Sequence, residues 1–152
     1  LDREKRGMTM KTDREQIQEV MATYTNAIDA KDYDRLMGCF TADATAVYGS
    51  HSDILKGQSG ILAHMKKMLD PLDGTQHLMT NFLIDIDGDS AKLAADTLGQ
   101  HWRRGADGGE RNMGGGKYAV DLRRVGGKWQ ITTIRTRSLW SDGNQALVPK
   151  VK

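Results

Sequence analysis

The sequence lacks the features that mark secreted, membrane-spanning or nucleic-acid-binding proteins. Its 152 residues include one cysteine, Cys39, so no internal disulfide framework can form, which agrees with a reducing compartment. No run approaches the roughly 18 apolar residues of a membrane span, and the N-terminus has no apolar signal-peptide core. The net charge is only +2, and the basic residues are dispersed among acidic ones. We therefore expect a cytoplasmic protein with no nucleic-acid or membrane partner.

Motifs for cofactors are also missing. No pair of the four histidines has metal-ligand spacing, and there is no cysteine cluster. His51 and His64 belong to a polar loop and to an expected helix. No glycine fingerprint stands between a strand and a helix, as a dinucleotide site would need. We expect neither a metal nor another cofactor, and we expect Cys39 to be buried in its apolar surroundings, LMGCF.

The length and the 38% hydrophobic content fit one globular domain with a core of its own. The charged opening stretch has no apolar period and indicates a loose arm. We expect an arm over residues 1–12, a domain over residues 13–142 and a tail over residues 143–152.

Helical spacing of apolar residues dominates the first half of the chain. It predicts helices over residues 13–30, 32–40 and 56–70, the last of them stopped by Pro71. Asp13, with Gln16 three residues on, resembles a capping pair, and Asp32 is the expected cap of the second helix. A short strand is expected over residues 41–49.

The second half reads as a series of strands, over residues 76–86, 91–102, 117–125 and 128–140. Asp87-Gly88 and Gly126-Gly127 supply tight hairpin turns. We interpret the glycine-rich residues 103–116 as a mobile hairpin loop. Helices followed by antiparallel strands indicate an α+β fold, with helices on one face of a curved sheet. The gap between a long helix and a bent sheet is the natural place for a pocket.

Four stretches in this order resemble the SnoaL-like branch of the NTF2-like superfamily: YTNAIDAKDYDRLMGCFTADA, KGQSGI, HLMTNFLIDIDGDSA, and GGKYAVDLRRVGGKWQI with SLW after it. The resemblance spans nearly all of residues 13–142. It implies a cone in which three N-terminal helices pack on a strongly curved antiparallel or mixed sheet. It also implies a homodimer or a homotrimer that binds a hydrophobic small molecule.

Dehydratases of the scytalone and bile-acid 7α types, within this branch, use a helix tyrosine and aspartate with a sheet histidine. Tyr24, Asp29 and His77 stand at the matching positions, and Tyr48 matches an aromatic that lines the pocket. The resemblance therefore implies that the first three are catalytic and that Tyr48 binds substrate. Other relatives are polyketide cyclases and isomerases, and some have no known catalysis, so the fold alone does not define the function.

The residue pattern supports this trio unevenly. Tyr24 lies near the centre of the buried stripe of its helix, whereas Asp29 falls about 120° away, at the border. His77 opens a strand with two largely apolar faces. A histidine on a covered face needs a hydrogen-bond partner, and Asp29 is the partner we expect.

Hairpin register extends the candidate site. An Asp87-Gly88 turn places His77 opposite Leu98, so that Gln100 and Trp102 share its face and line the pocket. A three-residue loop would shift the pairing by one residue, and His101 would then share the face of His77.

The last strand offers an arginine. Alternation places Trp129, Ile131, Thr133, Arg135 and Arg137 on one side. Arg135 or Arg137 could hold a substrate oxygen or an acyl anion. A solvated strand end or a salt bridge between subunits is an equally good reading of these arginines.

The first hypothesis is a cofactor-independent lyase, most simply a dehydratase. It would act on a hydrophobic, hydroxylated small molecule of aromatic, polyketide or steroid type by acid–base chemistry of His77, Asp29 and Tyr24. A polyketide cyclase or an isomerase would share the first half of this path. The hypothesis from another class is a ligand carrier without catalysis. A ring-hydroxylating dioxygenase small subunit is disfavoured, because those chains carry longer N-terminal extensions and no catalytic triad.

Overall fold

The computed structural model describes residues 10–49 and 53–148, which form one helical layer on one sheet. In chain order the elements are α1 (Asp13–Ala30), α2 (Tyr33–Gly38), β1 (Phe40–Tyr48), β2 (Leu55–Lys56), α3 (Gly57–Leu69), β3 (Gly74–Asp87), β4 (Ser90–Trp102), β5 (Arg111–Val125), β6 (Lys128–Gly143) and the short 3-10 helix η1 (Gln145–Leu147). The expected α+β order, with three helices before the main strands, is confirmed.

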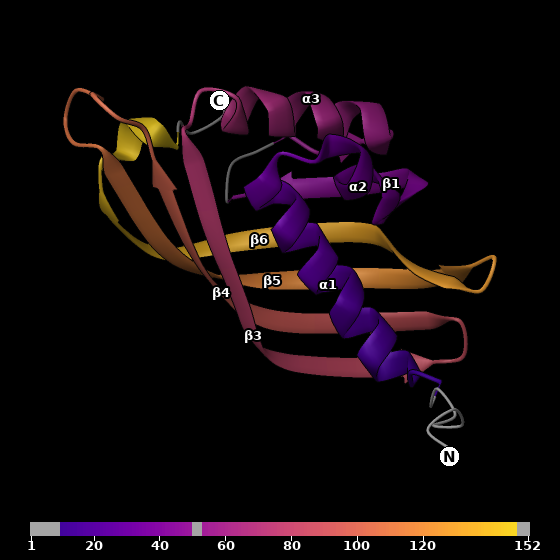
Figure 1. The fold of residues 1–152 in the computed structure, drawn as a ribbon. Helices are drawn as coiled ribbons and strands as arrows, with labels where there is room; N and C mark the ends of the chain where they lie inside the picture. Colours follow the sequence, from indigo (N-terminus) through magenta and orange to yellow (C-terminus); the bar gives the residue numbers. More distant parts are fainter. Residues whose placement is uncertain (1–9, 50–52, 149–152) are drawn as a thin grey trace, which may run out of the picture.

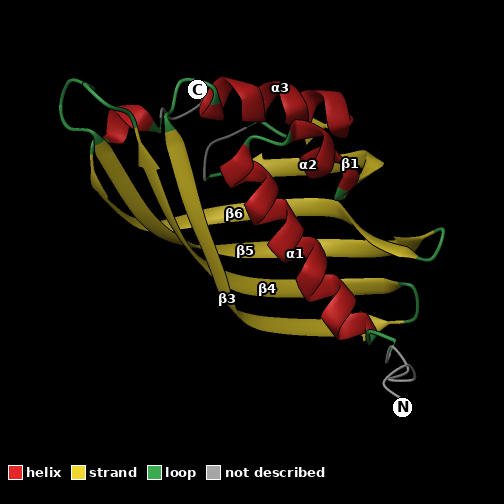
Figure 2. Cartoon of the chain, in the orientation of Figure 1, coloured by secondary structure: helices red, strands yellow, loops and turns green. Residues whose placement is uncertain are grey.

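The six strands form one mixed sheet in the order β2-β1-β6-β5-β4-β3. Only β1 and β6 run parallel, and the other neighbours are antiparallel. Helix α1 crosses one face of the sheet, and the strands curl toward α3 at one end (Figures 1 and 2). This is the cone that the family resemblance implies. Within the described residues, no helix is both long and apolar enough to cross a membrane.

The first turn of α1 is held by a capping box on its backbone and by side-chain hydrogen bonds to the sheet. Thr12, not Asp13, is the N-cap, and it forms a capping box with Glu15. The Asp13 carboxylate instead accepts hydrogen bonds from Arg124 (2.8 Å) and from the Trp129 indole (3.1 Å). These bonds tie the start of α1 to β5 and β6. The cap expected of Asp32 at α2 is present.

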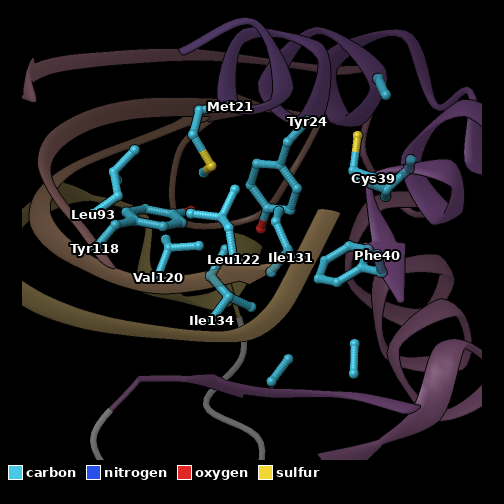
Figure 3. Close-up of a cluster of buried hydrophobic side chains, with 14 of the residues drawn as sticks. Met21, Tyr24, Cys39, Phe40, Leu93, Tyr118, Val120, Leu122, Ile131 and Ile134 are labelled. Atoms are coloured by element: carbon cyan, nitrogen blue, oxygen red, sulfur yellow. The ribbon is translucent and has the colours of Figure 1, made fainter. Parts of the chain in front are cut away.

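The core lies between α1 and the inner face of the sheet, the face that α1 covers (Figure 3). Met21 and Tyr24 of α1 have no exposed surface, and neither do Ile131 and Ile134 of β6. Each such side chain contributes about 1.5–3 kcal/mol by leaving water. Buried core residues from the other strands include Phe40, Leu93, Tyr118, Val120 and Leu122.

A bulge in β3 changes which residues face the core. Thr80 pairs with Asp96 but Leu83 pairs with Ala94, so two residues of β3 stand opposite one of β4. Asn81, within this step, has φ 56, a left-handed conformation that asparagine tolerates better than most residues. Side chains therefore alternate in opposite phase on either side of the bulge, and Leu83 is 73% exposed.

The register that results corrects the expected hairpin. Asp87 pairs with Ser90, so the turn residues are Gly88 and Asp89, one position later than expected. That shift alone would leave the same β4 residues on the face of His77, because it moves every pairing along β4 by two residues. The bulge then moves the pairings beyond it back by one residue, and His77 stands opposite Gly99 instead of Leu98.

A second bulge has the same effect in β6. Asp121 pairs with Thr133 and Leu122 pairs with Ile131, which leaves an extra residue between the two partners in β6. Ile131 and Ile134 both face the core, so Thr133 and Arg135 lie on the outer face. The predicted alternation, with Ile131 and Arg135 on one side, is wrong for this reason.

The glycine-rich stretch is only partly a loop. β4 ends at Trp102 and β5 begins at Arg111, so the connection is residues 103–110 and the glycines after it belong to a strand. Gly115 is there because a Cβ would lie 2.4 Å from Nε1 of Trp140, whose ring covers it. The loop expected over residues 103–116 is therefore wrong in its second half.

Candidate active site

A cavity of about 500 Å³ opens at the curled end of the sheet. Its walls come from β1, α3, β3, β4, β5, β6 and η1. Three imidazoles and two phenols line it, those of His64, His77, His101, Tyr48 and Tyr118. Helix α3 and the strands therefore enclose a hollow that contains acid–base groups, whereas the expected gap between the long helix α1 and the sheet is filled by the core.

The cavity exists because inner-face positions are empty of side chains at this end. Gly99 of β4 pairs with Gly114 of β5, and Thr97 pairs with Gly116. Further along the same strands, Leu93 and Val120 occupy the inner face and are buried. The change from branched side chains to glycine converts a packed core into a hollow.

Asp29 and His77 meet at one wall of this cavity. The Asp29 carboxylate at the end of α1 lies 2.7 Å from the ring nitrogen Nδ1 of His77, and it accepts the His77 backbone N–H at 2.9 Å. The Thr75 hydroxyl donates to the same carboxylate at 2.8 Å. Both side chains of the pair are largely covered, at 24% exposed for Asp29 and 13% for His77. The contact expected from the sequence is present, with Thr75 as an additional partner.

The charge of Asp29 fixes the tautomer of His77. Burial acts to raise the pKa of Asp29, but the hydrogen bonds from His77 and Thr75 outweigh it and hold that pKa below its ordinary value. An ionised carboxylate only accepts hydrogen bonds, so Nδ1 of His77 carries the proton. Nε2 is then the accepting nitrogen. It points toward Gly99, where a Cβ would lie 3.2 Å away.

The phenols form a second cluster. The Tyr24 hydroxyl donates to the Tyr48 hydroxyl at 3.0 Å, and the rings of Tyr24 and Tyr118 meet edge to face at 6.2 Å. Tyr24 is fully buried behind the other two and is not part of the cavity wall. Because Tyr48 accepts from Tyr24, its own proton is free for a ligand.

Burial controls the protonation of this cluster. It raises the pKa of Tyr48 well above the ordinary value and that of Tyr118 to about 12. The pKa of Tyr24 is also raised well above its ordinary value, first by burial and then by its two phenol neighbours. All three phenols are therefore neutral hydrogen-bond donors at physiological pH.

Two more histidines reach the cavity. The His101 ring meets the His77 ring edge to face at 5.2 Å, and its buried Nδ1 has no hydrogen-bond partner within the described residues. Burial, with His77 beside it, lowers the pKa of His101 to about 4. His64 of α3 stacks on the Tyr48 ring at 5.3 Å, and burial lowers its pKa too. His51 lies outside the described residues.

The structure separates three expected binding residues from this cluster. Gln100 and Trp102 alternate away from His77 because of the bulge in β3, and neither is part of the cavity wall. Arg135 lies on the outer face, 3.6 Å from the Asp121 carboxylate, and lines a different hollow of about 720 Å³. Our placement of these residues in the pocket is therefore wrong, since each bulge inverts the faces beyond it.

Sequence reasoning missed Tyr118, His64 and the glycines of the cavity. Tyr118 lies in a strand whose alternating pattern predicts that it is buried. The pattern does not show that it contacts Tyr24. His64 occupies a helix position that looked polar. The glycines carried a usable signal, because glycine inside a strand often marks close approach of another group.

The residues 10–135 match the SnoaL-like domain family, and the chain belongs to this family. A protein of Mycobacterium tuberculosis strain H37Rv, itself uncharacterized, is 33% identical over 95 residues. That match covers 60% of this chain and 62% of the mycobacterial protein, less than two thirds of its length.

Solved structures with the same fold come from several proteins. A proposed aromatic ring hydroxylase of Novosphingobium aromaticivorans is 26% identical, with a TM-score of 0.79 over 89% of this chain and 95% of its own. A proposed scytalone dehydratase of the same organism is 18% identical, with a TM-score of 0.78 and 85% of each chain covered. A hexachlorocyclohexane dehydrochlorinase, LinA type 2, is 20% identical, with a TM-score of 0.77 over 86% of this chain and 88% of its own. These likenesses establish the NTF2-like fold.

Proposed function

We propose that this protein is a cofactor-independent lyase, a dehydratase that removes water from a hydrophobic, hydroxylated small molecule. The observation that carries the proposal is the pair of hydrogen bonds by which Asp29 orients His77. In the neutral imidazole they leave Nε2 of His77 as the basic nitrogen, at the wall of a cavity that also contains two phenol donors.

The first step is proton removal. Nε2 of His77 takes the proton from the carbon next to a substrate carbonyl, and the negative charge of Asp29 stabilises the imidazolium that forms. Tyr48 donates a hydrogen bond to the carbonyl oxygen as it gains enolate charge, and Tyr118 is a second donor. One such donor contributes about 3–4 kcal/mol to stabilising a transition state.

The second step is loss of the hydroxyl group. The enolate re-forms the carbonyl, the bond from the β carbon to the hydroxyl oxygen breaks, and His77 returns its proton to that oxygen. Water leaves, a carbon–carbon double bond remains, and the enzyme is regenerated without a cofactor. Tyr24 acts in this scheme as a positioning residue, because it holds the Tyr48 hydroxyl and does not reach the cavity.

The comparisons agree with an elimination. Two of the similar folds carry names that denote loss of water and loss of hydrogen chloride. Both reactions need a base on one side of a carbon–carbon bond and a leaving group on the other. An isomerase or a polyketide cyclase would use the same proton removal without the leaving group, and this is the alternative to the elimination.

The test compares turnover in matched variants. β-Hydroxy ketones with one or two rings are screened for enone absorbance with wild type, His77→Gln, Asp29→Asn and, as a control far from the cavity, Ser90→Ala. We expect a 10²–10⁴-fold loss of kcat for His77→Gln and a comparable loss for Asp29→Asn, with Ser90→Ala unchanged. Equal rates in wild type and His77→Gln would remove the base from the mechanism. Ligand binding without any turnover, unchanged in both site variants, would identify a carrier.

The remaining sequence expectations stay predictions. We propose a domain over residues 13–142, with an arm before it and a tail after it. We also propose a homodimer or homotrimer in the cytoplasm, which size-exclusion chromatography with light scattering and cell fractionation would check.

A further inference from the structure

One cross-strand row of the inner face runs through the whole cavity. His77 of β3 pairs with Gly99 of β4, Gly99 with Gly114 of β5, and Gly114 with Ser141 of β6. The row therefore begins at the proposed base, crosses two positions without side chains, and ends at a hydroxyl. All four residues line the cavity.

The length of this row limits the ligand. Neighbouring strands lie about 4.8 Å apart, so His77 and Ser141 are separated by roughly 14 Å along the sheet. The His77 ring leans over β4, because a Cβ on Gly99 would come within 3.0 Å of it. About two strand spacings, roughly 10 Å, remain between the imidazole and Ser141. Two fused six-membered rings fit that distance.

The far end of the row carries hydroxyl groups. Ser138 and Thr136 of β6 pair with Gly116 and Tyr118, so they share the inner face with Ser141. Lys117 and Arg137 also line the cavity, and Lys117 forms an ion pair with Asp96. A ligand that lies along the row therefore meets hydroxyl groups from β6 at this end.

Ser141 is limited to accepting a hydrogen bond from a ligand. Its hydroxyl donates to Oε1 of Gln145 at 2.9 Å, while the amide nitrogen of Gln145 donates to the Gly143 carbonyl at 3.3 Å. Because the Gln145 nitrogen is used in this way, its oxygen faces Ser141 and takes the serine proton. The free lone pairs of the Ser141 oxygen then require a donor.

We propose that Ser141, oriented by Gln145, forms a subsite that recognises a hydroxyl group at the end of a two-ring ligand whose other end reaches His77. The inference rests on the proposed function for the position of the reacting end. It adds the substrate class: a hydroxyl donor is required at the far end, and an ether or a ketone there is disfavoured.

The experiment uses two ketones that cannot lose water, so binding is measured without turnover. The probes are 6-hydroxy-2-tetralone and 6-methoxy-2-tetralone, which differ only in the donor at the far end, and each Kd is measured by titration calorimetry. Wild type should bind the hydroxy probe about tenfold more tightly. Ser141→Ala should bind both equally, and Ser90→Ala, on the distant hairpin, should keep the wild-type preference.

A second variant tests the direction of the hydrogen bond. In Gln145→Leu the Ser141 proton is released, so the serine can donate to the methoxy oxygen, and the preference should fall to within about threefold. Circular dichroism and the melting temperature show that each variant is folded.

The outcomes separate this proposal from the proposed function. Equal binding of the probes by wild type, an undiminished preference in Ser141→Ala, or no binding of either probe up to its solubility overturns the subsite. The preference should persist in His77→Gln, whose kcat tests the elimination independently. A carrier without turnover would therefore still show the subsite, and a dehydratase could lack it.

Discussion

The same four strands, β3 to β6, build a packed core at one end of the sheet and a cavity at the other. Under α1, the inner face carries Leu93, Val120 and Ile131, which are almost completely buried. At the curled end, glycine, serine and threonine occupy equivalent positions, and the space holds imidazoles and phenols. Strands β4 and β5 pair without a register shift across both ends. The size of the inner-face side chains, rather than the arrangement of the strands, therefore distinguishes the packed half of the cone from the half that we propose contains the active site.

The two ends are joined through α1. Its start is fixed to β5 and β6 by Asp13, and its buried face packs on the core. Its last turn then delivers Asp29 to His77. A helix anchored over the rigid half can position a carboxylate in the hollow half with little freedom to move, as a site of this kind requires.

The largest expected effect is a loss of stability when a side chain in the packed half is shortened. Ile131→Ala removes a side chain with no exposed surface and should lower the free energy of unfolding by about 2–5 kcal/mol. Ser138→Ala, on the same strand and face but in the hollow half, should change it by less than about 0.5 kcal/mol. Urea denaturation of both variants measures the contrast. Similar losses in the two variants would show that the hollow half is packed as tightly as the core.

The next effect is a pH dependence that belongs to the hollow half. The pKa of His101 is about 4 in the folded protein and about 6.5 when unfolded, so between these values only the unfolded chain binds the proton. Wild type should therefore lose up to about 3 kcal/mol of stability as the pH falls from 6.5 to 4. His101→Gln should lack this loss. Urea midpoints across this range check it, and identical slopes in both proteins would mean that His101 titrates normally.

The smallest predicted effect concerns a missing methyl group. Gly99 has a backbone conformation open to alanine, but a Cβ would lie 3.0 Å from Cδ2 and 3.2 Å from Nε2 of His77. Gly99→Ala should displace the imidazole and lower kcat about tenfold, roughly 1.4 kcal/mol, with KM little changed. Gly38→Ala, where a Cβ meets nothing within 4 Å, is the matched control. Unchanged kcat in Gly99→Ala would show that the ring adjusts freely.

Much of the fold could be predicted from local patterns. Apolar spacing gave α1 at its observed bounds, and alternation with turn residues gave the strands and the Gly126-Gly127 hairpin. These features depend on residues close together in the chain. The cap of α1 was missed by one residue, because Thr12 and Asp13 are both good caps and the choice depends on Arg124, far away in sequence.

The candidate site was only partly predictable. The contact between Asp29 and His77 could be expected, because a covered histidine needs a partner and the family resemblance supplied one. The faces of Gln100 and Arg135 could not, because each depends on a bulge that adds one residue and inverts the alternation beyond it. Asn81 was the local signal for the first bulge, since asparagine adopts the left-handed conformation more readily than most residues.

The sequence by itself determined where the helices and strands lie and which side chains need burial or a partner, because these properties follow from short-range spacing and from chemistry. Only the tertiary structure decided that His101 and Tyr118 enter the cavity while Arg135 leaves it, and that glycines line it. The physical reason is that a strand has a period of two. A single bulged residue changes the local sequence pattern little, yet it exchanges the inner and outer faces for the rest of the strand.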